Sequence, residues 1–252
     1  MIDRAIADSA AINVEIFRGR VSRNSTPCRL RERELELIVA LVSLHAPLPR
    51  DTLLAHLWPG VVKERAAPTL RTTVHRLRRC IGEHTTIVHE GGYRLADNVR
   101  VDVRDAEEIM RASRALSDGD GPGREHIERL FRSVDVDLPY VYDTWAWFRK
   151  VKPRLVELRR ACGLLLIDVD LRALHYSSAI ETAERLLTFD QTDTSVVSII
   201  ARAYLEGGKP LEAKRRIRQH AKFLAQEYGS KLPLGVLRLV GEDDFYDAAS
   251  SS

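Results

Sequence analysis

The sequence predicts a mainly α protein with a small β component, and two observations carry this prediction. Apolar residues recur at helical spacing in "RERELELIVALV" and through most of the chain after Asp105. Short segments that alternate between apolar and polar residues occur near the N-terminus, in "INVEIF", and again in "TTIVHEGGYRLADN". The strands are therefore expected in the first 100 residues or so, and helices throughout.

The composition is that of a folded globular chain. Of the 252 residues, 44% are apolar and 30% are charged, so a buried core is expected. No apolar run approaches the length of about 18 residues that a membrane-spanning helix needs, and the N-terminus lacks the pattern of a secretory signal. The three cysteines are widely scattered, which favours reduced thiols in a cytoplasmic protein over a disulfide framework.

The first elements follow from local patterns. Small strands are expected within residues 12–30, where the segments alternate. A helix is expected near 31–45, because its apolar residues fall mostly on one face. A shorter helix, capped by Asp51, is expected to follow two prolines and to end near Trp58.

The next helix is expected over about residues 67–81. Pro68 suits its first turn, where the backbone N–H has no helical partner, and Gly82 suits the left-handed position that ends a helix. The chain then alternates and turns at Gly91 and Gly92, which predicts a β-hairpin. Three helices followed by a hairpin would form one compact unit.

The remainder of the chain is expected to be helical. The segment "DGDGPG" at 118–123 is a candidate boundary, and a long helical segment with Pro153 near its middle should form one kinked helix or two helices. Ala179 and Ala213 lie 34 residues apart at equivalent points of a weak repeat. This period favours tetratricopeptide-like helix pairs, with an ordinary helical bundle as the alternative.

The helix near 67–81 carries a concentration of positive charge. Between Lys63 and Ile81 the chain has six Lys or Arg residues and a single acid, Glu64. An apolar stripe recurs along the helix at Leu70, Val74, Leu77 and Ile81. On a helical wheel the opposite side holds Thr72, His75, Arg76 and Arg79, with Arg71, Arg78 and Thr73 beside them.

An aliphatic-backed helix that presents guanidinium and hydroxyl groups outward suits the major groove of DNA, because Arg pairs bidentately with guanine. The alternative is a solvated charged face, which most basic runs are. Two neighbouring segments favour DNA binding. A helix and a helix-breaking segment precede the basic helix, and a hairpin with Arg94 near its tip follows it.

These segments together resemble a known family. "RERELELIVALV", "LPRDTLLAHLWPG", "TLRTTVHRLRRCIG" and "HEGGYRL" are similar to the winged helix-turn-helix domain of OmpR-type response regulators, and more closely to that of the Streptomyces antibiotic regulatory proteins. "VDVRDAEEIM", "LPYVYDTWAWFR" and "FLAQEYG" resemble the bacterial transcriptional activator domain that follows in those proteins. The resemblance covers about residues 12–240. It implies a DNA-binding domain over 1–103 and a tetratricopeptide-like activator domain over 104–252.

The resemblance also implies roles for individual residues. It implies Thr73 and Arg76 toward bases, Arg78 toward a phosphate and Arg94 in the wing. The helical wheel adds Thr72, His75 and Arg79 as contacts, with Arg71 on the rim. In the family, the loop between the second and third helices contacts RNA polymerase, and the matching residues here are Val62, Lys63, Glu64 and Arg65.

We therefore expect a bacterial transcription regulator, an activator and not an enzyme. It would read the major groove with residues 67–81 and contact the minor groove or the DNA backbone with the wing at 86–96. The expected partners are double-stranded promoter DNA, RNA polymerase and a second copy of the chain, without a membrane or a cofactor. The alternatives are a protein-interaction adaptor, or a ligand sensor that uses the helical half, with no direct DNA readout.

Other residues with chemical potential are expected to be structural. The eight histidines lack the spacing of metal ligands, and no nucleophile motif or phosphate-binding loop occurs, so neither a metal site nor a catalytic residue is expected. Trp145, Trp147 and Phe148 are clustered and are expected to fill a gap between helices, with a ligand pocket as the alternative.

Overall fold

The fold is described from a computed structural model of the chain. The described residues are 11–44, 47–82, 86–89, 92–115, 123–242 and 245. Contacts divide the chain into two compact units, one formed by Met1–Pro122 with Arg129–Arg159 and the other by Gly123–Glu128 with Arg160–Ser252. This division follows spatial compactness, and the family-based boundary after residue 103 stays a prediction.

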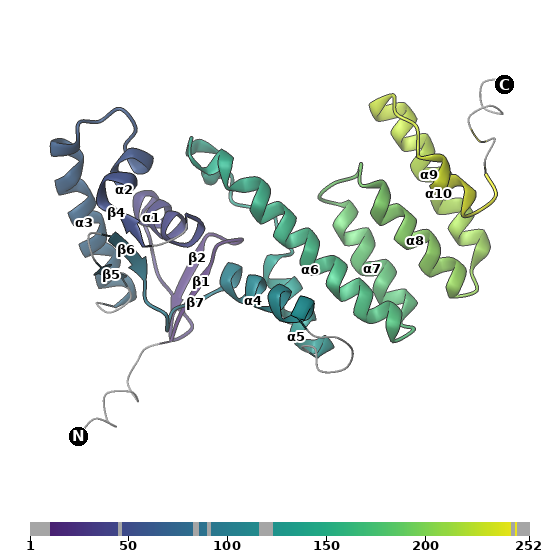
Figure 1. Cartoon of the computed structure of the whole chain (residues 1–252), viewed down its shortest axis with the longest axis horizontal. Coiled ribbons are helices and arrows are strands. Elements are labelled where there is room, and N and C mark those ends of the chain that lie inside the picture. Colours follow the sequence, from purple (N-terminus) through teal and green to yellow (C-terminus); the bar gives the residue numbers. More distant parts are fainter. Residues whose placement is uncertain are drawn as a thin grey trace. The chain divides into compact units, whose positions relative to one another are not determined.

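The first unit begins with a small sheet whose strand order is β3-β2-β1-β7 (Figure 1). β1 (Ile12–Glu15), β2 (Arg20–Arg23) and β3 (Thr26–Pro27) are antiparallel, and β7 (Arg100–Val101) joins β1 in parallel. The turn from β1 to β2 needs glycine at position 19. Its φ is +62°, and a Cβ there would come within 2.9 Å of the Pro139 ring. The strands expected within residues 12–30 are confirmed.

Three helices and a second sheet complete the N-terminal part of this unit. The helices are α1 (Glu32–Ser43), α2 (Arg50–Leu57) and α3 (Lys63–Ile81). The sheet has the order β4-β6-β5, in which β5 (Thr86–His89) and β6 (Gly92–Leu95) form the expected hairpin and β4 (Leu48–Pro49) was not expected. Residues 90 and 91, between the paired strands, lie outside the described residues.

The start of α3 differs from the prediction. The helix begins at Lys63, four residues before the expected start at 67, so Pro68 lies in its second turn. Proline removes one helical hydrogen bond there, and the carbonyl it leaves belongs to Glu64, an exposed residue that water can reach. Ala66 and Ala67 are buried, which stabilises the additional turn.

Two predicted helix ends also need correction. Asp51 does not cap α2, because Pro49 occupies the N-cap and Asp51 is inside the helix. Gly82 does follow α3, but its φ of 101° and ψ of 147° differ from the left-handed helical conformation that was expected. This region is one that glycine reaches and other residues rarely do.

The middle of the chain holds α4 (Asp102–Ala115), α5 (Arg124–Val134), two 3₁₀ turns, η1 (Tyr140–Thr144) and η2 (Phe148–Lys150), and then α6 (Lys152–Arg172). Pro153 is the second residue of α6 and causes no break in its middle, which corrects the expected kink. Most of the candidate boundary at 118–123 lies outside the described residues. Trp145, Trp147 and Phe148 are buried, as expected.

The second unit is built from successive antiparallel helices (Figure 1). They follow the part of α6 from Arg160 onward and are α7 (Tyr176–Leu187), α8 (Thr194–Glu206), α9 (Pro210–Tyr228) and the short α10 (Leu234–Arg238). Ala179 and Ala213, the equivalent positions of the weak repeat, are both fully buried, and their small side chains let neighbouring helices approach closely. The predicted fold class, mainly α with a small β component, is confirmed.

Two observations bear on the wider class of protein. Cys28, Cys80 and Cys162 are free thiols, the first two half-buried and the third buried. Among the described residues, no helix combines the length and the apolar run needed to cross a bilayer.

A buried carboxylate connects the N-terminal sheet to α4. Asp102 accepts hydrogen bonds from the backbone N–H groups of Ile16, at 3.0 Å, Phe17, at 3.1 Å, and Val103, at 2.8 Å. Burial raises the pKa of Asp102 from its ordinary 3.8 to about 6, although the hydrogen bonds oppose that shift.

The raised pKa of Asp102 predicts how stability changes with pH. Between its unfolded and folded pKa values the folded state holds more protons, so this group's contribution falls as the pH rises from about 4 to 6. Asp102→Asn lacks the titration. Urea titrations of the wild type and the variant measure the difference between their free energies of unfolding. This difference, wild type minus variant, should decrease by roughly 2 kcal/mol as the pH rises from 4 to 7. A difference that grows with pH would contradict this.

Candidate nucleic-acid interface

The inner face of α3 is formed by an aliphatic stripe. Leu70, Leu77 and Ile81 are almost completely buried, and Val74 nearly so. The helix packs against α1 and α2, which lie on this side of it. Each such side chain contributes about 1.5–3 kcal/mol when it is removed from water, so the stripe sets the rotation of the helix about its axis.

The outer face of α3 carries the predicted cationic residues. Arg71, Thr72, His75, Arg76 and Arg79 are exposed, and Arg78 is half-buried. Across the described part of the chain, no carboxylate lies within ion-pair distance of Arg71, Arg76 or Arg79. The guanidiniums of these three residues therefore remain available to an anion.

Thr73 does not join this face. Its side chain is 6% exposed, and its hydroxyl donates to the carbonyl oxygen of Thr69 at 2.9 Å. Position 73 lies beside the apolar stripe, three residues after Leu70 and four before Leu77, which explains the burial. The family resemblance implies that Thr73 contacts a base, but its buried position does not support this contact.

The strands β5 and β6 after α3 pair as an antiparallel hairpin. Val88 pairs with Tyr93 and His89 with Gly92, and Gly92 allows β4 to approach closely, since a Cβ there would lie 3.1 Å from the Leu48 carbonyl oxygen. Arg94 is half-buried and donates to the carboxylate of Asp97 at 2.7 Å. The Asp97 side chain is largely exposed, at 88%, so this ion pair contributes little to stability.

The segment implied to contact RNA polymerase is only partly a loop. Val62 precedes α3, whereas Lys63, Glu64 and Arg65 form its first turn, which corrects the expectation that all four lie in a loop. All four are exposed, and Val62 most clearly, at 63%. Lys63 donates to the Asp51 carboxylate at 2.5 Å, and this hydrogen bond lowers the pKa of Asp51.

An aromatic segment from the second half of the chain supports α1. The indole N–H of Trp147 donates to Glu36 at 3.0 Å, and the hydroxyl of Tyr142 donates to the Ile16 carbonyl at 2.8 Å. Glu36 is 2% exposed and also accepts a hydrogen bond from Arg33. Burial raises the pKa of Glu36, while Trp147 and Arg33 act in the opposite direction. Sequence reasoning missed these contacts, because they join residues more than 100 positions apart.

The comparisons with known proteins bear on the fold. No protein-family model matches the chain, and no curated protein matches it. A solved structure does: Mycobacterium tuberculosis EmbR in complex with a low-affinity phosphopeptide superposes with a TM-score of 0.63 over 93% of this chain, at 18% identity. This chain shares the EmbR fold.

The likeness has a defined extent. The chain spans 65% of the length of the EmbR chain it matches. At 18% identity the match establishes the fold alone, and it supports the fold expected for an antibiotic regulatory protein. The order of a small N-terminal sheet region followed by a helical bundle agrees in both.

The hydrogen bond between Trp147 and Glu36 gives a stability prediction. Trp147→Phe keeps an aromatic ring but removes the indole donor from a buried carboxylate, so the free energy of unfolding should fall by about 1–3 kcal/mol in urea titrations. Trp58→Phe is the matched control, since its indole N–H has no partner among the described residues. Equal losses in the two variants would contradict a specific role for the bond to Glu36.

Proposed function

We propose that the chain is a transcription regulator that binds double-stranded promoter DNA, with α3 in the major groove and the hairpin β5–β6 as a wing. The observation that carries the proposal is the outer face of α3, where Arg71, Arg76 and Arg79 are exposed and have no carboxylate partner among the described residues. A helix fits the major groove, and the planar guanidinium forms paired hydrogen bonds with guanine or phosphate.

The positions on α3 suggest that some of its residues contact base edges and others contact phosphates. Arg76 lies at the middle of the exposed face with His75 and Thr72 beside it, and these residues are proposed to face base edges. Arg71, five residues before Arg76, Arg79, three residues after it, and the half-buried Arg78 are proposed to contact phosphates. Arg94 would exchange its ion pair with Asp97 for a phosphate beside the wing.

Activation through RNA polymerase is the finer part of the proposal. The exposed segment between α2 and α3 has the aliphatic Val61 and Val62 next to charged Lys63, Glu64 and Arg65. An apolar centre with a charged rim is the composition of a protein contact site. Pairing of two copies on half-sites about one helical turn apart would complete the arrangement.

Arg76→Ala tests base readout. Loss of a bidentate contact should weaken binding to the preferred duplex by about 1–3 kcal/mol and relax the choice of base at one position. A mobility-shift titration with preferred and substituted duplexes measures both effects. Arg111→Ala is the control, because it removes the same charge from an exposed position on α4. Unchanged binding by Arg76→Ala would remove this residue from the interface.

Arg78→Ala tests the phosphate contact. Binding should weaken by a similar factor on every duplex, and the slope of log affinity against log salt should become shallower by about one. Fluorescence anisotropy at several salt concentrations gives this slope. A loss confined to one sequence would assign Arg78 to base recognition, and salt-independent binding by the wild type would favour the protein-adaptor hypothesis.

A further inference from the structure

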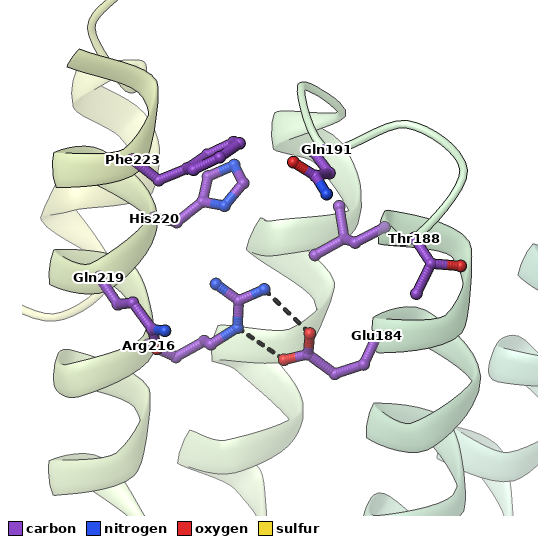
Figure 2. Close-up of a pocket in the computed structure, with 8 residues that line it drawn as sticks. Glu184, Thr188, Gln191, Arg216, Gln219, His220 and Phe223 are labelled. Atoms are coloured by element: carbon purple, nitrogen blue, oxygen red, sulfur yellow. Dashed lines mark hydrogen bonds and ion pairs between the residues drawn. The ribbon is translucent and has the colours of Figure 1, made fainter. Parts of the chain in front are cut away.

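A pocket of about 420 Å³ lies between α7 and α9 in the second unit (Figure 2). Its walls come from the end of α7 and the turn after it on one side, and from the middle of α9 on the other. The volume falls within the range of small-molecule sites in proteins, about 300–1,000 Å³. The DNA-binding proposal makes no use of this pocket.

An ion pair joins the two walls of the pocket. The guanidinium of Arg216 on α9 donates to the carboxylate of Glu184 on α7 through Nε, at 2.6 Å, and through Nη2, at 2.9 Å. Figure 2 shows the two side chains meeting between the helices. Because the paired charges compensate each other, an anion in the pocket would face Glu184 and a cation would face Arg216. The pair carries no net charge, so it offers neither an anion nor a cation an uncompensated partner, which suits a neutral ligand.

A buried imidazole beside the ion pair lacks a hydrogen-bond partner. His220 lines the pocket from α9, is 4% exposed, and its Nε2 has no partner among the described residues. Burial lowers the pKa of His220, and Arg216 lowers it further while Glu184 opposes the shift. The lowered pKa favours the neutral imidazole, which has one donor and one acceptor nitrogen. A buried polar atom without a partner is costly. Because Nε2 is shielded from solvent, a ligand gains this hydrogen bond when the His220 ring turns toward the pocket.

The remaining walls combine amide and apolar groups. Gln191, in the turn after α7, and Gln219, on α9, are exposed and line the pocket, and each has an amide oxygen and an amide N–H₂. Leu187 and Phe223 supply apolar surface, and the Phe223 ring lies 5.7 Å from that of His220. Paired donors and acceptors next to an aromatic ring complement an amide group attached to an apolar part.

We propose that this pocket binds a neutral ligand that bears an amide group beside an apolar portion. Such chemistry is found in free small molecules, for example cyclic dipeptides, and in the backbone of an uncharged peptide segment. The proposal goes beyond DNA binding and does not depend on it.

Isothermal titration calorimetry of the full chain tests the proposal in two arms. One arm uses cyclic dipeptides with one aromatic side chain, and the other uses N-acetylated, C-amidated tetrapeptides with uncharged side chains. We expect saturable binding in at least one arm, and the tighter arm identifies the source of the amide. Gln219→Ala should weaken that binding about tenfold, whereas Gln226→Ala, which removes an exposed amide from α9 outside the pocket, should leave it unchanged.

A second variant separates binding from folding. His220→Phe removes the unpartnered nitrogen and keeps an aromatic ring, so thermal unfolding should occur at the same or a higher temperature while binding is lost. The absence of saturable binding in both arms would overturn the proposal. So would equal effects of Gln219→Ala and Gln226→Ala, or equally tight binding of matching probes that carry a carboxylate. None of these outcomes bears on DNA binding, which is measured separately.

Discussion

Burial of the aliphatic stripe of α3 is the constraint on which the proposed interface depends. Leu70, Leu77 and Ile81 are buried in a helix that packs against α1 and α2, and their burial turns the opposite side of the helix to solvent. The guanidiniums then lie at high dielectric, where their mutual repulsion is small and is screened by salt. Such a surface destabilises the free protein only slightly, and its positive charges interact most favourably with a polyanion.

The same constraint explains why α1 is reinforced from a distant part of the chain. α1 packs against α3, and its buried Glu36 accepts hydrogen bonds from Trp147 and from the exposed Arg33, which also donates to the Leu57 carbonyl. Hydrogen bonds from Tyr142 and to Asp102 connect the turn after β1 to segments that follow the β5–β6 hairpin. The compact first unit therefore includes Arg129–Arg159, well beyond the hairpin, and mutations in the aromatic segment are expected to affect α1.

Local patterns predicted the helices and the hairpin, because periodicity, prolines and glycines act over a few residues. They did not predict β4 and β7, two-residue strands that exist only because tertiary contacts bring them beside β6 and β1. They place the start of α3 too late, because proline favours the first turn of a helix, whereas Pro68 lies in the second. They could not reveal the buried partners of Asp102, which are backbone N–H groups up to 86 residues away.

The candidate site shows the same limit. A helical wheel predicted the exposed positions of Arg71, Arg76 and Arg79, because amphipathic spacing decides which side is buried. It did not predict that Thr73 is buried, because a residue at the edge of the stripe is buried only where the neighbouring helices cover it. Likewise the 34-residue repeat predicted paired helices, but not the polar pocket that α7 and α9 form, since its lining depends on side chains outside the repeat pattern.

Selection of bound duplexes from a random pool tests the central claim most directly. If the outer face of α3 reads the major groove, sequencing of the bound fraction should give a recurrent motif, with half-sites separated by about one helical turn if two copies bind together. The same selection with Arg71, Arg76 and Arg79 all changed to Gln should give no motif. Recovery of an unenriched pool by the wild type, or of the same motif by the charge-removed variant, would contradict the account.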